Sequence, residues 1–290
     1  MSNLTVHHST VYSYGRPVRL GEHRMMFRPR DSHDLRLIRT SLNIDPQPVH
    51  LRWLHDAFDN SVAIATFEGV TERLSFESTV TLEHFESSPP DYQLEDYARS
   101  YPFRYSSDDF ANLTRALWRN DVDEEVDRWA LQFLDPSDET GTMKILRSLT
   151  AGIREQFIYT RRVEKGVQTP GQTLQWRRGS CRDFAVLMID AVRSLGIAAR
   201  FVSGYIYIPG NSRLNGGGAT HAWIQAYLPG AGWIDFDPTN SIVGNRNLIR
   251  VAVAWSQDQV LPLWGSYSAK ADTFSSMDVS VSVTEEGDGD

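Results

Sequence analysis

The sequence has one cysteine in 290 residues and no long run of apolar residues. A single cysteine excludes a disulfide within the chain, which fits a reducing compartment. The N-terminal stretch MSNLTVHHSTVYSYG lacks the apolar core of a secretory signal, and no segment resembles a membrane span. We therefore expect a cytoplasmic protein that has no membrane partner.

Positive charge and metal-binding motifs are also scarce. The formal net charge is −8, and no basic run is longer than a dipeptide, so we expect no nucleic-acid partner. The sequence has no HExxH or CxxC pattern, and the residues after His84 contain one histidine and one cysteine. These are too few for a zinc site, and no acidic loop has the form of a calcium site. We expect neither a metal nor any other cofactor.

The N-terminal part, residues 1–90, has the pattern of β-strands. Several segments are rich in β-branched and aromatic residues and are separated by polar turns: LTVHHSTVYSY, LRLIRTSLNI, SVAIATFEG and RLSFESTVTLEHF. An antiparallel β-sandwich-like domain is the simplest way to pack them. The stretch ESSPPDY at 86–92 predicts the end of this domain.

The remaining sequence mixes helical and strand patterns. Residues 122–133 and 145–157 carry apolar stripes at helical spacing, whereas AARFVSGYIYI, THAWIQAYL and WIDFD have the composition of strands. We predict a second domain at 91–280, which makes the chain an α+β protein with a helix packed on an antiparallel sheet. MDVSVSVT alternates again near the end. The last residues, 281–290, are predicted to form an acidic disordered tail.

The lone cysteine lies in GSCRDFAVLMIDAVRSLG, residues 179–196. Ser180 and Asp183 have the spacing of a capping box, so we predict that Ser180 caps a helix and that Cys181 is its first residue. Free backbone N–H groups and the positive end of the helix dipole favour an anion at that position. Cys181 is therefore a candidate thiolate nucleophile.

His221 is the sole histidine after His84, and it lies in the predicted strand THAWIQAYL. Asp237 ends the next predicted strand, directly before a proline. A thiol, an imidazole and a carboxylate are the parts of a Cys-His-Asp triad: the thiolate attacks an acyl group, the imidazole takes and returns the proton, and the carboxylate orients the imidazole. Asp235 is the alternative acid, because it alternates onto the same face of the strand as Asp237.

His221 and Asp237 can meet in an antiparallel hairpin only if both lie on one face of it. In a hairpin, the numbers of directly opposite residues always add to the same total. Two residues on different strands share a face only if their own total and this constant are both even or both odd. Because 221 and 237 add to an even number, the constant must be even, and the loop must contain an odd number of residues. An unbulged four-residue loop at 229–232 would separate them. We predict a five-residue loop at 227–231, a three-residue loop around Gly230, or a bulge near 230–232.

Two stretches resemble the core of the transglutaminase-like superfamily: GSCRDFAVLMIDAVRSLGIAARFVSGYIY and THAWIQAYLPGAGWIDFDPTN. They are similar in particular to bacterial proteins that carry an N-terminal β domain before a papain-like Cys-His-Asp core. The resemblance implies that Cys181 is the nucleophile, His221 the general base and acid, and Asp237 the orienting carboxylate in preference to Asp235. It also implies a thiol-dependent acyl transfer on amide or peptide bonds.

Several groups are candidates to stabilise the oxyanion or to line the cleft. The backbone N–H of Cys181 is a natural donor at a helix start. Related enzymes add an aromatic N–H or O–H upstream of the cysteine helix, which here indicates Tyr159; an ordinary interfacial tyrosine is the alternative. Trp223, beside the histidine, is expected to form a wall of the cleft or to pack in the core. Gln175 is expected to belong to a short turn, TLQW.

The acceptor of the acyl group stays open. Water would make the protein a cysteine peptidase or amidase, and an amine would make it a protein-glutamine transglutaminase. Hydrolysis is the first expectation, with a protein or peptide as substrate. The alternative is a non-catalytic protein- or peptide-binding module on the same scaffold. The sequence indicates no oligomeric state.

Overall fold

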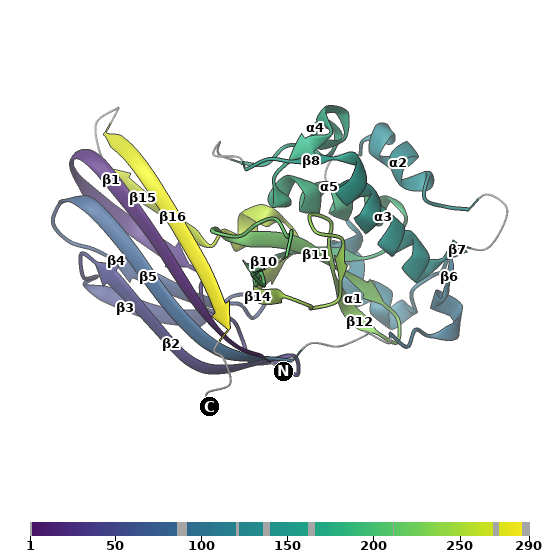
Figure 1. Ribbon diagram of the computed structural model, residues 1–290, viewed down its shortest axis with the longest axis horizontal. Helices are drawn as coiled ribbons and strands as arrows, with labels where there is room; N and C mark the ends of the chain where they lie inside the picture. The colour runs from purple at the N-terminus through teal and green to yellow at the C-terminus, as the bar shows by residue number, and fades with distance from the viewer. Residues whose placement is uncertain are drawn as a thin grey trace.

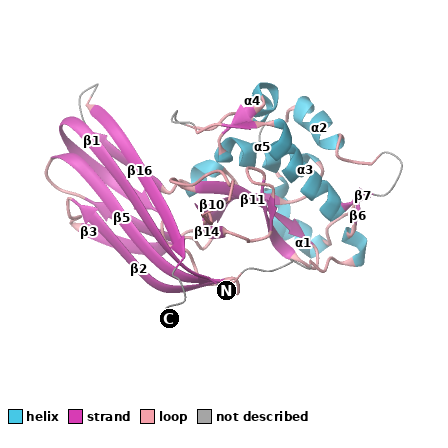
Figure 2. Ribbon diagram, in the orientation of Figure 1, coloured by secondary structure: helices cyan, strands magenta, loops and turns pink. Residues whose placement is uncertain are grey.

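The computed structural model describes residues 2–85, 92–119, 122–135, 140–161, 166–210, 212–268 and 273–285. It has two parts, a curled antiparallel sheet and a mixed part in which helices cover another antiparallel sheet (Figure 1, Figure 2). The predicted α+β class is confirmed. Residues 86–91, where the sequence predicts the division between domains, lie outside the described residues.

The first sheet is organised around one long strand. β1 (Ser2–Met25) pairs along its first half with β5 (Thr71–His84) and at its end with β4 (Ser61–Thr66). β2 (Leu35–Asp45) and β3 (His50–His55) extend the two sides. The resulting order is β2-β5-β1-β4-β3, with every pair antiparallel.

β1 changes partners where its ladder is interrupted. Its pairing with β5 shifts register between Ser13 and Val18, and the stretch between them contains Gly15 and Pro17, which disfavour a regular central strand. The sheet curls around an apolar cluster of its own. The buried members of that cluster are Tyr14, Val18, Met25, Phe27, Ile44, Ala63, Ala65, Leu74 and Phe76.

Two strands from near the end of the chain join the same sheet. β15 (Leu263–Ser268) and β16 (Phe274–Glu285) both pair antiparallel with β1. The predicted ranges 91–280 and 281–290 do not anticipate this, because residues 281–285 form the end of β16 and residues 286–290 lie outside the described residues. The alternation of MDVSVSVT explains the strand, since Val281 is buried. Its partner, however, lies at the other end of the sequence.

The second sheet has the order β13-β12-β11-β10-β14, with every pair antiparallel. Its strands are β10 (Ala199–Ile206), β11 (His221–Leu228), β12 (Gly232–Asp237), β13 (Ile242–Val243) and β14 (Leu248–Ala254). The three strands predicted after the cysteine helix correspond to β10, β11 and β12.

The described α-helices are α1 (Ser107–Leu117), α2 (Glu124–Leu131), α3 (Thr142–Gln156), α4 (Pro170–Trp176) and α5 (Cys181–Ser194). α2 and α3 match the predicted apolar stripes, and α5 is the predicted cysteine helix. None of the helices in the described ranges is long and apolar enough to cross a membrane. The short elements are η1 (Asp96–Ala98), η2 (Gln257–Val260), the antiparallel pair β6 (Ser100–Tyr101) and β7 (Thr140–Gly141), and the parallel pair β8 (Ile158–Tyr159) and β9 (Arg178–Gly179).

α5 lies at the centre of the mixed part. Its side chains Phe184, Leu187 and Met188 are fully buried and belong to the same apolar cluster as Ala222 and Ile224 of β11. Burying each large side chain contributes about 1.5–3 kcal/mol. This packing fixes the helix against the strand that begins at His221.

The two parts pack directly against each other. Leu4, Val6, Val80 and Leu82 of the first sheet form one buried cluster with Tyr205, Ile249 and Val251 of the second. Hydrogen bonds flank this cluster: His84 Nε2 donates to the Leu248 carbonyl at 3.1 Å, and His8 Nδ1 lies 2.9 Å from the Tyr205 hydroxyl. The first sheet therefore covers β10 and β14.

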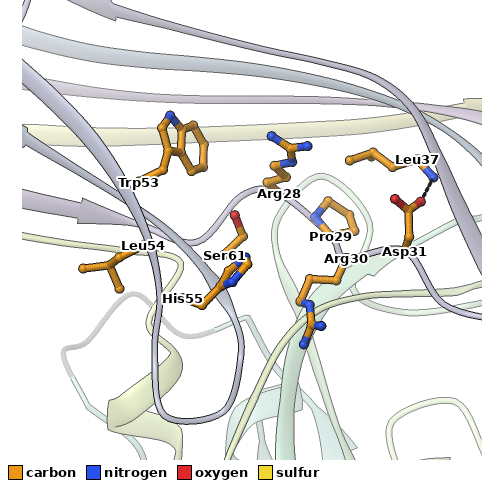
Figure 3. Close-up of a pocket in the computed structure, with 9 residues that line it drawn as sticks. All are labelled: Arg28, Pro29, Arg30, Asp31, Leu37, Trp53, Leu54, His55 and Ser61. Atoms are coloured by element: carbon orange, nitrogen blue, oxygen red, sulfur yellow. Dashed lines mark hydrogen bonds between the residues drawn. The ribbon is translucent and has the colours of Figure 1, made fainter.

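The first sheet also contains an open cavity of about 530 Å³ (Figure 3). Arg28, Trp53 and His55 are among the side chains that line it, and the Arg28 guanidinium lies 6.0 Å from the centre of the Trp53 ring. All the lining residues belong to the first sheet and its connections, between positions 28 and 61. This cavity is therefore separate from the cysteine helix.

Candidate active site

Cys181 occupies the first turn of α5, where the sequence predicts it. Ser180 is the N-cap, and the Asp183 carboxylate accepts hydrogen bonds from the backbone N–H and the hydroxyl of Ser180, both at 2.8 Å. The same carboxylate accepts from the backbone N–H of Gln168 at 2.7 Å. The predicted capping box is confirmed, and it fixes the start of the helix that carries Cys181. Cys181 itself is buried, with 7% of its surface exposed.

β11 and β12 form a hairpin with the register that a His221–Asp237 contact requires. Leu228 pairs with Gly232, so opposite residues have even sums and the loop consists of residues 229–231. The central glycine of this loop has a φ of 89°, a left-handed conformation that glycine adopts at little cost. The three-residue loop is one of the predicted solutions. It makes His221 and Asp237 diagonal neighbours on one face.

His221 and Asp237 form a buried ion pair. His221 Nε2 lies 2.9 Å from Asp237 Oδ2, and neither side chain is exposed. The Asp237 carboxylate also accepts from the backbone N–H of Thr239 at 2.9 Å and from the side-chain amide of Asn240 at 2.8 Å. Both carboxylate oxygens therefore have partners, which fix the orientation of the carboxylate.

The other ring nitrogen of His221, Nδ1, is buried and has no hydrogen-bond partner among the described residues. Because Nε2 contacts Asp237, Nδ1 is the nitrogen available to the Cys181 thiol. Burial by itself lowers the pKa of His221, but the charge and hydrogen bond of Asp237 and the interaction with Cys181 outweigh it and raise that pKa. The site thus favours the imidazolium, as a thiolate–imidazolium pair requires.

Gly216, in the connection between β10 and β11, lies against the imidazole. Its φ is 100°, and a Cβ at this position would collide with Nδ1 of His221. Asn240 holds this loop, because its Oδ1 accepts from the Asn215 backbone N–H at 2.7 Å and its Nδ2 donates to the Asn215 carbonyl at 3.1 Å. Asn240 therefore joins the loop to Asp237. Neither Asn240 nor Gly216 is predicted from the sequence, although both lie in motifs beside predicted residues, DPTN and NGGG.

Tyr159 lies close to Cys181. β8 pairs Tyr159 with Gly179 of β9, just before the cysteine helix. Burial, followed by the nearby charges of Cys181 and Asp237, raises the pKa of Tyr159 to about 12. A phenol is protonated at neutral pH, and this one is a candidate donor to an oxyanion.

Trp223 and Asp235 lie behind the histidine. Trp223 is fully buried and stacks on His221 with ring centres 5.9 Å apart and planes at 29°. It therefore packs in the core, which is the alternative that the sequence left open. The indole N–H donates to Asp235 Oδ1 at 2.6 Å. Of the two acids on β12, Asp237 contacts His221 and Asp235 contacts Trp223.

The expected turn around Gln175 is wrong. Gln175 is an exposed residue near the end of α4. Pro170 at the first helical position and a capping box between Thr169 and Gln172 start this helix. The sequence TLQW is therefore helical. Among the described residues, no group of three or more His, Cys, Asp or Glu side chains could hold a metal ion.

Two known family regions match separate parts of the chain. Residues 4–83 match the bacterial transglutaminase-like N-terminal region, and residues 132–238 match the transglutaminase-like superfamily. The chain belongs to the transglutaminase-like superfamily. The superfamily match spans Cys181, His221 and Asp237, and the N-terminal match spans most of the first sheet.

Relatives of this transglutaminase-like chain match it at modest identity. An uncharacterized protein of Mycobacterium tuberculosis is 29% identical over 301 residues, covering 98% of this chain and 93% of the relative. A protein-glutamine gamma-glutamyltransferase of Pseudomonas aeruginosa is 35% identical over 74 residues, covering 24% of this chain and 11% of that protein. The crystal structure of a candidate cysteine protease from Cytophaga hutchinsonii has a TM-score of 0.71 at 18% identity, covering 100% of this chain and 92% of that one. This last similarity extends to the whole fold.

Proposed function

We propose that this transglutaminase-like protein catalyses a thiol-dependent acyl transfer on amide or peptide bonds through Cys181, His221 and Asp237. The observation that carries the proposal is the 2.9 Å contact between His221 Nε2 and Asp237, with Nδ1 of the same ring buried and unpartnered within the described residues. A raised pKa of His221 supports the same roles, because the ring then holds a proton that it can give to a leaving group.

The reaction would proceed in two balanced steps. The Cys181 thiolate attacks the amide carbonyl carbon and forms a C–S bond. The C–N bond then breaks, and the imidazolium gives its proton to the departing amine, which leaves a thioester on Cys181. In the second step His221 takes a proton from water or from an amine, the new acyl bond forms, and the C–S bond breaks to restore the thiolate. Asp237 orients the ring throughout.

We assign two donors to the oxyanion that forms in each step. The backbone N–H of Cys181 lies at the N-terminus of α5, where helical N–H groups lack carbonyl partners within the helix. The Tyr159 hydroxyl is the second, since Tyr159 pairs with Gly179 just before the cysteine helix and a protonated phenol can donate a hydrogen bond. We assign it to this role in preference to a purely interfacial one.

We propose first that water is the acceptor of the acyl group, so that the protein is a cysteine peptidase or amidase. The similarity in fold to a candidate cysteine protease supports it. The local similarity to a protein-glutamine gamma-glutamyltransferase supports transfer to an amine instead. One experiment separates the two outcomes.

The protein is incubated with a proteome-derived peptide mixture in ¹⁸O-water that contains monodansylcadaverine, and the products are read by mass spectrometry. New C-termini or new side-chain carboxylates that carry ¹⁸O report hydrolysis, and glutamines that carry the amine report transamidation. We expect new termini, and Cys181→Ala should give neither product. Products that persist in Cys181→Ala, or their absence from the wild type, would contradict the proposal.

A second candidate function is a non-catalytic peptide-binding module. The observation that favours it is that His221 is shielded from solvent: its side chain is not exposed, and Gly216 lies against its Nδ1. Under this alternative, immobilised wild-type protein and Cys181→Ala would retain the same peptides from the mixture. Neither would form a product.

A further inference from the structure

A continuous set of side chains runs from His221 to the first sheet. His221 stacks on Trp223, whose indole N–H donates to Asp235. Arg250 of β14 then lies 3.8 Å from Asp235 and 3.1 Å from Asp34, and Asp34 belongs to the connection between β1 and β2. Each step is a contact between neighbouring groups, so the series joins the proposed triad to the other part of the molecule.

Arg250 lies between two carboxylates that come from different parts of the fold. Its guanidinium donates to both oxygens of Asp34, at 3.1 and 3.4 Å. Its side chain is 26% exposed, whereas those of Asp34 and Asp235 are 12% and 7% exposed. Such shielded pairs are screened little by solvent, so removing one member leaves its partner with an uncompensated charge.

Asp235 depends on this arrangement. Burial raises its pKa, and the charge of Arg250 and the hydrogen bonds of Trp223 and Gln225 act in the opposite direction. Asp34 in turn fixes the direction of the guanidinium. The acceptor of the Trp223 N–H therefore faces an arginine of β14, and Asp34 from the connection between β1 and β2 fixes the position of that arginine.

We propose that Trp223 and Asp235 are positioning residues for His221. Through the Arg250–Asp34 pair, the first sheet then also helps to fix the orientation of the His221 ring. The proposal rests on the proposed triad. Trp223 limits the tilt of the imidazole, and Asp235 limits the rotation of Trp223. The first sheet thus supplies a group on which the reactivity of Cys181 depends.

The test measures alkylation of Cys181 by iodoacetamide between pH 5.5 and 9, by intact mass, in full-length variants. Arg250→Met should lower the rate near pH 6 by about tenfold and Asp34→Asn by about two- to threefold, within the range seen for mutations along coupled networks. Arg250→Lys should recover part of the loss. Near pH 9 all variants should react at similar rates, because the free thiol ionises there without help from the imidazolium.

A matched control comes from another ion pair of the first sheet, Arg73 and Asp45, at 3.4 Å. This pair lies on β5 and β2 and is exposed, so Arg73→Met and Asp45→Asn should react like the wild type. In a Trp223→Phe background, Asp34→Asn should have no further effect, because the acceptor link is already broken.

Wild-type rates in both Arg250→Met and Asp34→Asn would overturn the inference while leaving the triad intact. So would a full additional loss from Asp34→Asn in the Trp223→Phe background. If Arg250→Met does not fold, Asp34→Asn and its Asp45→Asn control decide the question. Slow alkylation of the wild type near pH 6 would instead contradict the triad, and the inference would fall with it.

Discussion

The two buried carboxylates of β12 lie two positions apart on the same face of one strand, yet their surroundings differ. Asp237, at the end of the strand, accepts from His221, Thr239 and Asn240. Asp235, in the middle, accepts from Trp223 and faces Arg250. Sequence position and burial are alike, so they cannot assign a role. The role of each carboxylate follows from the side chain that it contacts.

The largest expected difference is in catalysis. Asp237→Asn should lower kcat/KM by about 10³–10⁴-fold, because an amide can hold the imidazole in the wrong tautomer and cannot stabilise its charge. Asp235→Asn keeps an acceptor for Trp223 and should cost about tenfold or less. Rates of product formation on a peptide found in the mixture experiment provide the measurement. Equal losses of kcat/KM in the two variants would mean that the two carboxylates do not differ in their role in catalysis.

The second prediction concerns pH and stability. The folded-state pKa of His221 is raised by Asp237 and Cys181 despite its burial. A raised pKa contributes stability that is fully present below the unfolded value, about 6.5, and that is lost as pH rises through the folded value. In a thiolate–imidazolium pair the thiol has already lost its proton, so the extra proton on the ring changes the balance only above the ordinary thiol value, about 8.5. There the free energy of unfolding should fall by up to about 1.4 kcal/mol per unit more in the wild type than in His221→Gln. Urea denaturation at several pH values measures this. Parallel curves that persist above about pH 8.5 would mean that the ring is neutral in the folded protein.

A smaller effect is expected from the neutral partner of Asp237. Asn240→Ala removes one hydrogen bond to the carboxylate and both contacts to the Asn215 backbone. Bonds to charged groups contribute about 1.5–3 kcal/mol, so activity should fall by about ten- to a hundredfold. Asn112→Ala, which loses an exposed bond to the Asp108 carbonyl, is the matched control and should keep wild-type activity. An equally active Asn240→Ala would show that Asp237 needs no support from the loop.

The smallest expected effect separates two glycines of one loop. Gly216 and Gly218 both have a positive φ, but a Cβ at Gly216 would meet His221, whereas one at Gly218 would meet open space. Both alanine variants should lose about 1 kcal/mol of stability for the backbone conformation. Gly216→Ala alone should also lose activity, by about threefold or more. Equal activities would mean that the loop moves away from the ring during turnover.

The parts of the site that could be predicted from sequence depend on local patterns. The capping residues place Cys181 at a helix start, and strand alternation with an odd-length loop brings His221 to Asp237. The choice between Asp237 and Asp235 rests on family resemblance, because both acids satisfy the same alternation. Their distinct partners, Trp223 and His221, follow from side-chain directions that alternation does not specify.

Contacts between distant segments could not be predicted in this way. β16 has a clear alternating pattern, but nothing local indicates that its partner is β1. The Arg250–Asp34 pair joins residues far apart in the sequence, and each alone is typical of a solvated surface. The support of Asp237 by Asn240 depends on a turn whose geometry is set by the folded loop. These features require the three-dimensional arrangement.

Cys181 and His221 act as an ion pair in the proposed mechanism, and alkylation of the thiol tests this pairing without knowledge of the substrate. The rate of iodoacetamide addition to Cys181 is measured by intact mass at pH 6 in the wild type and in His221→Ala. We predict rapid addition in the wild type and addition slowed by about tenfold or more in the variant, because the imidazolium favours the thiolate. Equal rates in the two proteins would contradict the claim.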